Sequence, residues 1–395
     1  MKLIPLASIL IFSSIYIPSV SAENFETCVK RLQVTAKEQG LSQDIIDNTL
    51  AKVKYVPRVV ELDNQQPEFS QTFEGYYNRR VTEARVVQGR RLLKENRAFL
   101  EQLTKKYGVP AQYLLAFWGL ETNFGGYKGK MPVLDSLATL ACLPRRSKYF
   151  TGELMQALKL KQKYGFSSDD MVGSWAGAMG HTQFMPSAYA QYAIDADGSG
   201  KADLWNSQED ALTSAAYFLQ QLGWNRNERW GREVILPRGF SYQNTGKAQI
   251  KPLTDWSALG LLNTNRTPLS TPDLQASLYL PSGHTGPAFL AYENFDVIMR
   301  WNRSTFYAIA VGRLANRING GGVLTVKPPE MPRLSREKLK ALQESLNEKG
   351  FEVGEADGIL GSRSIIGLQA YQKSQGLIAD GYPSVATFQS LGLSI

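Results

Sequence analysis

The chain is short of the residues that metal and nucleophile chemistry most often use. Its 395 residues include 2 cysteines, Cys28 and Cys142, and 2 histidines, His181 and His284. These four residues do not make a convincing zinc site, and the scarcity of histidine argues against a histidine-activated nucleophile. Long apolar runs are also missing after the first 22 residues, so we expect no stable membrane insertion.

Residues 1–22 have the pattern of a secretory signal peptide. Lys2 supplies the charged start, residues 4–17 the apolar stretch, and residues 20–22 a cleavage site of small residues. A lipid anchor would need a cysteine directly after the cleavage point, where Glu23 stands. The sequence therefore predicts an exported, periplasmic protein without a lipid anchor.

The charge and the cysteines fit an exported protein. The formal net charge is +8, which becomes +7 without the signal peptide because Lys2 is its only charged residue. Such an excess suits an anionic polymer or a membrane surface as partner, and we expect no nucleic acid. In an oxidising compartment Cys28 and Cys142 are expected to form a disulfide, with two separate buried thiols as the alternative.

The pattern along the chain indicates a mainly α protein with a few short strands. Helix-like periodicity dominates residues 23–322, and the best strand candidates are residues 234–236 and 276–280. Residues 323–332 form a proline-rich linker. Residues 333–395 then form a small three-helix domain, in which two Asp-Gly turns each precede a predicted helix.

One carboxylate lies on an apolar helix face within residues 110–126. Glu121 shares that face, at the spacing i, i+3, i+4 and i+7, with Leu114, Phe117 and Trp118. Burial and the C-terminal end of the helix dipole would both raise the pKa of Glu121. A carboxylic acid that stays protonated near neutral pH can protonate the leaving oxygen of a glycoside. The alternative is that the carboxylate turns outward into water.

A second block, residues 174–187, is rich in small residues that allow a close approach to a ligand. In it, Gln183 offers a donor and an acceptor suited to a sugar hydroxyl or acetamido group. Near these blocks no second acid pairs naturally with Glu121, although a standard glycosidase uses two. A substrate that supplies its own nucleophile would not need the second acid.

These blocks resemble a known enzyme family. Glu-Thr-Asn-Phe-Gly at 121–125, Gly-Ala-Met-Gly-x-x-Gln-Phe-Met-Pro-Ser at 177–187 and the segment 300–307 are similar to the soluble lytic murein transglycosylase B family, glycoside hydrolase family 103. Residues 333–395 resemble the peptidoglycan-binding domain of cell-wall enzymes. In that domain Leu360 replaces a phenylalanine of the family pattern, and Tyr371-Gln372 stands for Phe-Gln.

The resemblance implies a lysozyme-like catalytic domain that binds peptidoglycan glycan strands. It implies cleavage of the MurNAc-β-1,4-GlcNAc bond without water, leaving 1,6-anhydroMurNAc ends, with Glu121 as the single acid/base and no cofactor in the chemistry. It also implies sugar-contacting residues, namely Ser174, Gln183, Tyr217, Asn302 and Tyr307. Trp301 stands where relatives have a tyrosine, which keeps a ring for stacking, and Phe124 is a further candidate for stacking on a sugar face. For each of these aromatic residues, Tyr217 included, the alternative is plain packing in the core.

A loop at residues 195–206 resembles a calcium-binding loop. Its oxygen ligands at positions one, three, five and, through a carbonyl, seven would be Asp195, Asp197, Ser199 and Lys201. Position twelve is Asn206 rather than a glutamate, and the family resemblance implies that Glu209 or Asp210 supplies the missing acid. We expect a structural calcium or sodium ion here, and the alternative is a polar turn without an ion.

Two other functions remain open at this stage. A hydrolytic muramidase would share the acid but would need a second carboxylate to activate water. A non-catalytic peptidoglycan-binding protein would keep the groove and the C-terminal domain and would tolerate the loss of Glu121. For each of the three functions we expect a monomer.

Overall fold

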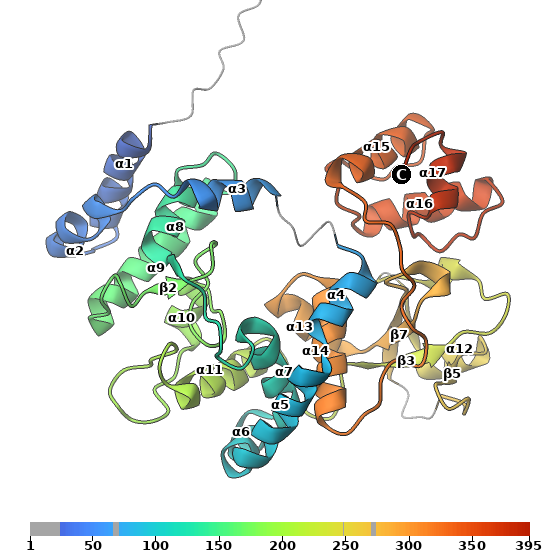
Figure 1. Cartoon of the computed structure of the whole chain (residues 1–395), viewed down its shortest axis with the longest axis horizontal. Helices are drawn as coiled ribbons and strands as arrows, with labels where there is room; N and C mark the ends of the chain where they lie inside the picture. Colours follow the sequence, from blue (N-terminus) through green and yellow to red (C-terminus); the bar gives the residue numbers. More distant parts are fainter. Residues whose placement is uncertain (1–23, 66–70, 248, 270–273) are drawn as a thin grey trace, which may run out of the picture.

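The structure is a computed structural model that describes residues 24–65, 71–247, 249–269 and 274–395. The predicted signal peptide lies outside these ranges. The described chain is mainly helical with a few short strands, as the sequence predicts (Figure 1). None of its helices combines the length and the apolar character needed to cross a membrane.

Helices make up most of the described chain before residue 230. They are α1 (Phe25–Glu38), α2 (Gln43–Asn48), η1 (Leu50–Lys52), α3 (Pro57–Gln65), α4 (Phe73–Arg80), α5 (Glu83–Glu95), α6 (Arg97–Tyr107), α7 (Ala111–Thr122), α8 (Val133–Ala141), α9 (Ser147–Tyr164), α10 (Pro186–Tyr192) and α11 (Gln208–Gln221). The short strands β1 (Met131–Pro132) and β2 (Val172–Gly173) pair antiparallel beside α8.

A sheet with its own helices follows, and three further helices end the chain. The sheet strands are β3 (Gly231–Ile235), β4 (Ile250–Pro252), β5 (Leu262–Asn263), β6 (Gln275–Tyr279) and β7 (Ala288–Ala291). The other elements are η3 (Tyr242–Asn244), α12 (Leu253–Ala258), η4 (Gly283–Thr285), α13 (Glu293–Trp301), α14 (Thr305–Ile318), α15 (Arg336–Glu348), α16 (Ser362–Ser374) and α17 (Val385–Ser390).

Helix α7 is surrounded by other helices of the molecule. It contacts α14, α5, α6 and α11 (Figure 1). Because helices surround it, residues 113–120 are buried on every side, so the single apolar face that the spacing predicts is only part of a fully buried surface. The element that carries Glu121 is therefore held rigidly from several directions.

A separate hydrophobic core joins α1 and α2 to α8, α9 and α10. Cys28 of α1 and Cys142, the residue that caps the end of α8, form a disulfide with their Cα atoms 5.8 Å apart. Cys28 is fully buried in this core. The cross-link thus fixes the N-terminal helix onto the body, as the sequence predicts for a bridged pair.

The sheet has the order β4-β6-β7-β3-β5 and is antiparallel throughout. The two strand candidates of the sequence fall mostly within β3 and β6. The sequence did not reveal β7, because its run of four buried residues has no alternation to distinguish a strand from a buried helix segment.

The proline-rich segment is anchored where it begins. The carboxylate of Glu233, a buried residue of β3, accepts hydrogen bonds from the backbone N–H groups of Thr325 and Val326 at 2.9 to 3.1 Å. Leu324 is buried in the same core as α7. The first part of the expected linker is therefore fixed along the sheet.

The C-terminal domain is built on two matching glutamine clamps. Gln343 accepts a hydrogen bond from Gly358 N–H, and its amide donates to the Ile359 carbonyl and to a hydroxyl at the start of α16. Gln372 makes the same set of bonds to Gly381 N–H, the Tyr382 carbonyl and a hydroxyl of α17. Both glutamines are buried, so the internal repeat of the sequence is a repeat of hydrogen bonding.

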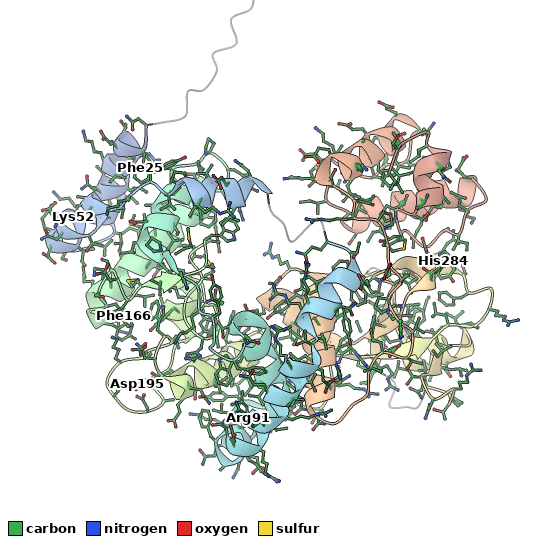
Figure 2. The ribbon with its side chains drawn as sticks, viewed as in Figure 1. Phe25, Lys52, Arg91, Phe166, Asp195 and His284 are labelled. Atoms are coloured by element: carbon green, nitrogen blue, oxygen red, sulfur yellow. A yellow bond between two sulfur atoms is a disulfide. The ribbon has the colours of Figure 1, made fainter. Side chains whose placement is uncertain are left out.

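The second turn of this domain contacts the sheet unit. Asp380 accepts hydrogen bonds from the backbone N–H of His284 at 2.9 Å and pairs with the His284 Nδ1 at 2.7 Å. Gln369 of α16 donates to the carbonyl of Tyr242 and to the hydroxyl of Thr245. Figure 2 shows His284 on the side of the sheet unit that faces the C-terminal helices. These polar contacts therefore hold the C-terminal domain against the part of the chain that contains the sheet.

Candidate active site

Glu121 lies in the last turn of α7, which ends at Thr122, before the end of the range 110–126 that the sequence predicts. Pro110 is the N-cap rather than the first helical residue, and Asn123 ends the helix by adopting a left-handed conformation with φ 50°. The chain then passes through Gly125, also left-handed, where a Cβ atom would lie 2.3 Å from the His181 ring. Only glycine allows this close approach.

Two donors hold one oxygen of the Glu121 carboxyl group. The indole Nε1 of Trp301, at the end of α13, donates to Oε1 at 2.9 Å, and the hydroxyl of Tyr307, in the first turn of α14, donates to the same oxygen at 2.5 Å. Ser304 caps α14 and so fixes the position of Tyr307. The carboxyl group therefore points into the protein and is anchored at Oε1, which leaves Oε2 as the oxygen that can carry a proton.

Burial raises the pKa of Glu121 above its ordinary value, because the charged form loses its water. The hydrogen bonds from Tyr307 and Trp301 and the charge of Arg80 act in the opposite direction, and burial outweighs them. Burial also raises the pKa of the Tyr307 hydroxyl, with a further contribution from the nearby Glu121 charge, so this group stays a donor. The carboxylate does not turn outward, which was the alternative left open by the sequence.

The role of Trp301 goes beyond what the sequence indicated. Its ring packs against Phe117 at 4.6 Å, Phe218 at 5.2 Å and Phe184 at 5.4 Å between ring centroids. This half-buried position directs the indole N–H toward Glu121. The sequence offered only a ring for stacking, because a hydrogen bond across 180 residues leaves no local signal.

The loop of residues 174–185 is organised by its own polar side chains. The Ser174 hydroxyl accepts a hydrogen bond from Ala178 N–H at 3.0 Å. Gln183 has a left-handed backbone with φ 51°, and its amide nitrogen donates to the carbonyls of Gly180 and Lys128. Both residues predicted to contact sugar are thus used in shaping the loop, and the Gln183 carbonyl oxygen remains as an acceptor.

His181 connects this loop to the helix of Glu121, a role that the sequence analysis missed. The Trp118 indole donates to its Nδ1 at 3.0 Å, and the Thr122 hydroxyl donates to its backbone carbonyl at 2.8 Å. Burial, with the nearby charge of Lys128, lowers the pKa of His181 to about 4, so the ring is neutral and can accept from Trp118. In the sequence, only the position of His181 within a glycine-rich block pointed to this role.

The other predicted sugar-contacting residues have different surroundings. Asn302 is exposed at the end of α13, next to Trp301. Tyr217 is half-buried on α11, with its ring near Tyr107 and Tyr192. The stacking prediction for Phe124 is corrected. Its ring is only 7% exposed and lies edge-on against Trp118, so core packing takes the surface that a sugar would need.

Two acids of the loop at residues 195–206 lie together with a third from the start of α11, and Figure 2 labels the first of them, Asp195. One carboxylate oxygen from each of Asp195, Asp197 and Asp210 lies within 4.8 Å of the other two. Asp210 is fully buried and accepts the N–H groups of residues 196, 197 and 203. Such a set of hard oxygen donors fits a calcium ion.

The remaining predicted ligands are not part of this group. Glu209 is exposed and lies outside the cluster, whereas Asp210, the other acid named for the missing ligand, belongs to it. The Ser199 hydroxyl donates to the Lys201 carbonyl at 3.1 Å, so these two groups bond to each other.

Comparisons with known proteins agree with this geometry. Residues 24–316 match the family described as transglycosylase SLT domain, and residues 335–391 match the putative peptidoglycan binding domain. The membrane-bound lytic murein transglycosylase B of Escherichia coli strain K12 is 31% identical over 296 residues, which is 71% of this chain and 79% of that protein.

Solved structures extend the similarity to the fold. SltB3 from Pseudomonas aeruginosa, in complex with NAG-anhNAM-pentapeptide, has a TM-score of 0.89 and 39% identity, covering 94% of this chain and all of that chain (100%). The Escherichia coli lytic transglycosylase Slt35 in complex with calcium has a TM-score of 0.62 and 31% identity, covering 74% of this chain and 92% of that one.

A lysozyme-like helical fold that matches the transglycosylase SLT domain, joined to a peptidoglycan-binding domain, defines a lytic transglycosylase. Within that class the matches are more specific. The chain belongs to the lytic murein transglycosylase B family.

Proposed function

We propose that this enzyme cleaves the MurNAc-β-1,4-GlcNAc bond of peptidoglycan and that Glu121 alone supplies the acid and the base. The observation that carries the proposal is the anchoring of Oε1 by Trp301 and Tyr307 in a setting that raises the pKa of the carboxyl group. Such a group holds its proton near neutral pH and presents it from a fixed direction.

The reaction needs two proton transfers at the same oxygen. First, Glu121 gives its proton to the glycosidic oxygen as the bond to C1 of the muramic residue breaks. Glu121, now ionised and stabilised by its two donors, then takes the proton of the muramic 6-hydroxyl while that oxygen bonds to C1. The products are a free GlcNAc 4-hydroxyl and a 1,6-anhydroMurNAc end, and no water is consumed.

The remaining predicted residues would bind the glycan around this point. The Gln183 carbonyl oxygen is an acceptor for a sugar N–H or hydroxyl, since the amide nitrogen is engaged within the loop. Asn302 is exposed beside Trp301, where it can orient an acetamido group. Ser174 and Tyr217 would make further contacts with the glycan.

We also propose a structural calcium ion at Asp195, Asp197 and Asp210. The support is the convergence of three carboxylates in this chain, together with the calcium complex of the similar Slt35. The ion would fix the loop that follows α10 and takes no part in the chemistry.

The predicted signal peptide and the C-terminal domain indicate where the enzyme acts. We propose export to the periplasm, cleavage of the signal peptide after Ala22, and binding of glycan strands by residues 333–395, with the protein acting as a monomer. The match to a peptidoglycan-binding domain supports the wall as the site of action.

Mass spectrometry of digested peptidoglycan tests the proposal directly. The mature enzyme should release muropeptides one water lighter than reducing-end muropeptides, and Glu121→Gln should release them about 10² to 10⁴ times more slowly. Reducing ends would instead show a hydrolytic muramidase and would require a second carboxylate. No products from either protein, with equal binding to the wall, would show a non-catalytic binding protein.

A further inference from the structure

Arg80, in the last turn of α4, reaches the end of the helix that carries Glu121. Its guanidinium donates to the carbonyl of Leu120 at 3.2 Å. This carbonyl belongs to the last turn of α7, where the final C=O groups have no partner within the helix. In its own sequence, Ala111–Thr122, α7 has no basic residue. The positive charge at the negative end of its dipole therefore comes from another helix.

An aromatic ring also holds the Arg80 guanidinium. Its Cζ atom lies 5.5 Å from the centroid of the Tyr76 ring, one turn earlier on α4. Tyr76 is buried, and its ring lies 6.0 Å from that of Phe306, which directly precedes Tyr307 in α14. The contacts of Arg80 therefore reach both the helix of Glu121 and a ring beside its donor, Tyr307.

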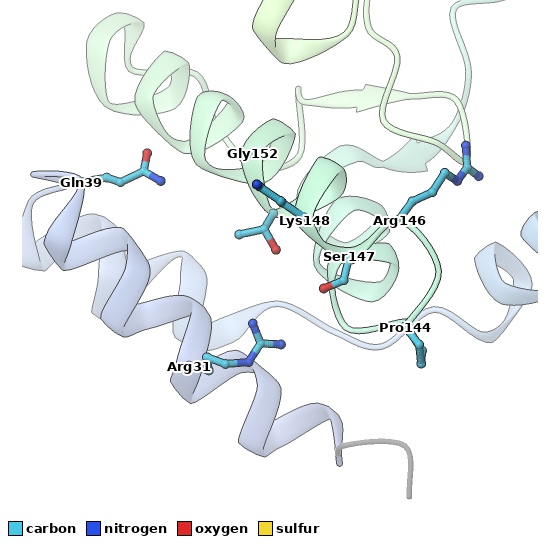
Figure 3. Close-up of a pocket in the computed structure, with 8 residues that line it drawn as sticks. Arg31, Gln39, Pro144, Arg146, Ser147, Lys148 and Gly152 are labelled. Atoms are coloured by element: carbon cyan, nitrogen blue, oxygen red, sulfur yellow. The ribbon is translucent and has the colours of Figure 1, made fainter. Parts of the chain in front are cut away.

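Arg80 forms no ion pair within the part of the chain that the structure describes. Two other arginines differ in this respect. Figure 3 shows Arg146 extending away from the hollow between α1 and α9, and its guanidinium pairs with Asp63 at 2.6 Å. Arg317 of α14 pairs with Glu83. The charge of Arg80 thus remains available to an anion that forms at the end of α7.

The groups that act on the charge of Glu121 come from α4, α13 and α14. Burial raises the pKa of this carboxyl group, and Tyr307, Trp301 and the charge of Arg80 act in the opposite direction. Of α5, α6 and α11, which also pack on α7, no described residue adds a charge that acts on Glu121. An arginine stays charged throughout, so its attraction for Glu121 grows as that group loses its proton.

We propose that Arg80 is a positioning residue for Glu121: it fixes the last turn of α7 and stabilises the carboxylate that forms when Glu121 has protonated the glycosidic oxygen. The inference rests on the proposed function, because it concerns the two proton transfers at this group. Glu121 has to release its proton readily and then stay ionised until the muramic 6-hydroxyl is deprotonated. Arg80 transfers no proton and acts only through Glu121.

The experiment uses the mature full-length enzyme and the variant Arg80→Met, which keeps a long side chain and removes its charge. Arg79→Met is the matched control, because Arg79 is the neighbouring exposed arginine of α4 and donates to Gln71. Arg85→Met is a second control. Arg85 binds the side chain of Asn123 at 3.3 Å, so its loss loosens the end of α7 without removing the charge of Arg80. Arg80→Lys keeps the charge.

The pH dependence of turnover separates the effect of the charge from structural support. With Arg80→Met, the plateau kcat should fall about fivefold, the upper end for an exposed charge. The pH at which kcat falls on the alkaline side should move upward, because Glu121 then holds its proton more firmly, and KM should not change. Arg79→Met and Arg85→Met should leave this pH in place, and Arg80→Lys should restore it.

Three outcomes would overturn the proposal. A raised KM with an unchanged plateau kcat would assign Arg80 to substrate binding. Equal changes in Arg80→Met and Arg85→Met would reduce its role to capping the helix. An Arg80→Lys protein that behaves like Arg80→Met would show that the charge is not what matters.

Titration of Glu121 without substrate keeps this proposal separate from the proposed function. The infrared band of the protonated carboxyl group, identified by its absence in Glu121→Gln, gives the midpoint directly. The midpoint should lie higher in Arg80→Met than in the wild type and should be unchanged in Arg79→Met. An unchanged midpoint in a folded Arg80→Met protein would refute the role of Arg80, and Arg80→Gln serves for the same comparison should Arg80→Met fail to fold. A wild type that cleaves no strand would refute only the proposed function.

Discussion

Removal of the disulfide should weaken the attachment of α1 without disturbing the carboxyl group of Glu121. Cys28 and Cys142 are 114 residues apart, and on the chain-entropy view a cross-link that closes a loop of this length stabilises the fold by about 5 kcal/mol. In the variant Cys28→Ala/Cys142→Ala we expect most of this stability to be lost from the core that contains α1, α2, α8 and α9.

Hydrogen exchange followed by mass spectrometry measures this loss locally. Peptides from α1 should exchange much faster in the variant, whereas those from α7 and α14 should change little, because these helices belong to a different core. At 25 °C kcat on short glycan fragments should be retained, since Trp301 and Tyr307 still hold Glu121. The wild type under reducing conditions is the control and should behave like the variant.

Two results would refute this reasoning. A loss in opening free energy of α1 below about 1 kcal/mol would mean that the unfolded chain is already restricted and that the cross-link adds little. A parallel loss of kcat at 25 °C would mean that the two cores are coupled more closely than their separate packing implies.

The other predictions concern the site itself. Glu121→Gln should lower kcat by about 10² to 10⁴. The same variant should have a higher melting temperature than the wild type at pH 7 but not in acid. Because burial raises the pKa of Glu121 in the folded state, ionisation of this group lowers the stability of the wild type as pH rises. Equal melting temperatures at both pH values would contradict this. Tyr307→Phe removes a donor to the carboxylate, so the pH at which kcat falls on the alkaline side should move upward; a downward shift would be inconsistent with the hydrogen bond. Calcium at 100 times its Kd should stabilise the fold by about 2.7 kcal/mol, and Asp195→Asn should remove the effect; stabilisation that persists in the variant would place the ion elsewhere.

The sequence predicted what local patterns can encode. The helix of Glu121, the mainly α class and two strands follow from short-range periodicity. The donors to Glu121 could not be derived in this way, because Trp301 and Tyr307 are 180 and 186 residues away in the chain. The stacking prediction for Phe124 failed for a related reason: a pattern shows that an aromatic ring is present but not which neighbour covers it.

The C-terminal domain shows the same limit in another form. The Asp-Gly turns were visible in the sequence, but the buried glutamines that hold them, Gln343 and Gln372, were visible only in part. A glutamine on a helix usually faces solvent, and only the folded chain shows that each one takes the N–H and carbonyl groups of a turn out of contact with water. The use of Asp380 to bind His284 depends on tertiary structure alone.

Because the C-terminal domain is docked on the sheet, the length of the linker before it should have little effect on the distance between the two domains. For two modules on a flexible tether, the effective concentration of one near the other is set by how many residues join them. Here Glu233 fixes residues 325 and 326, and His284 fixes Asp380, so the separation between the peptidoglycan-binding domain and the carboxyl group of Glu121 is set by rigid geometry. Glycine residues inserted between 327 and 332 would leave that separation unchanged for as long as the His284–Asp380 contact holds.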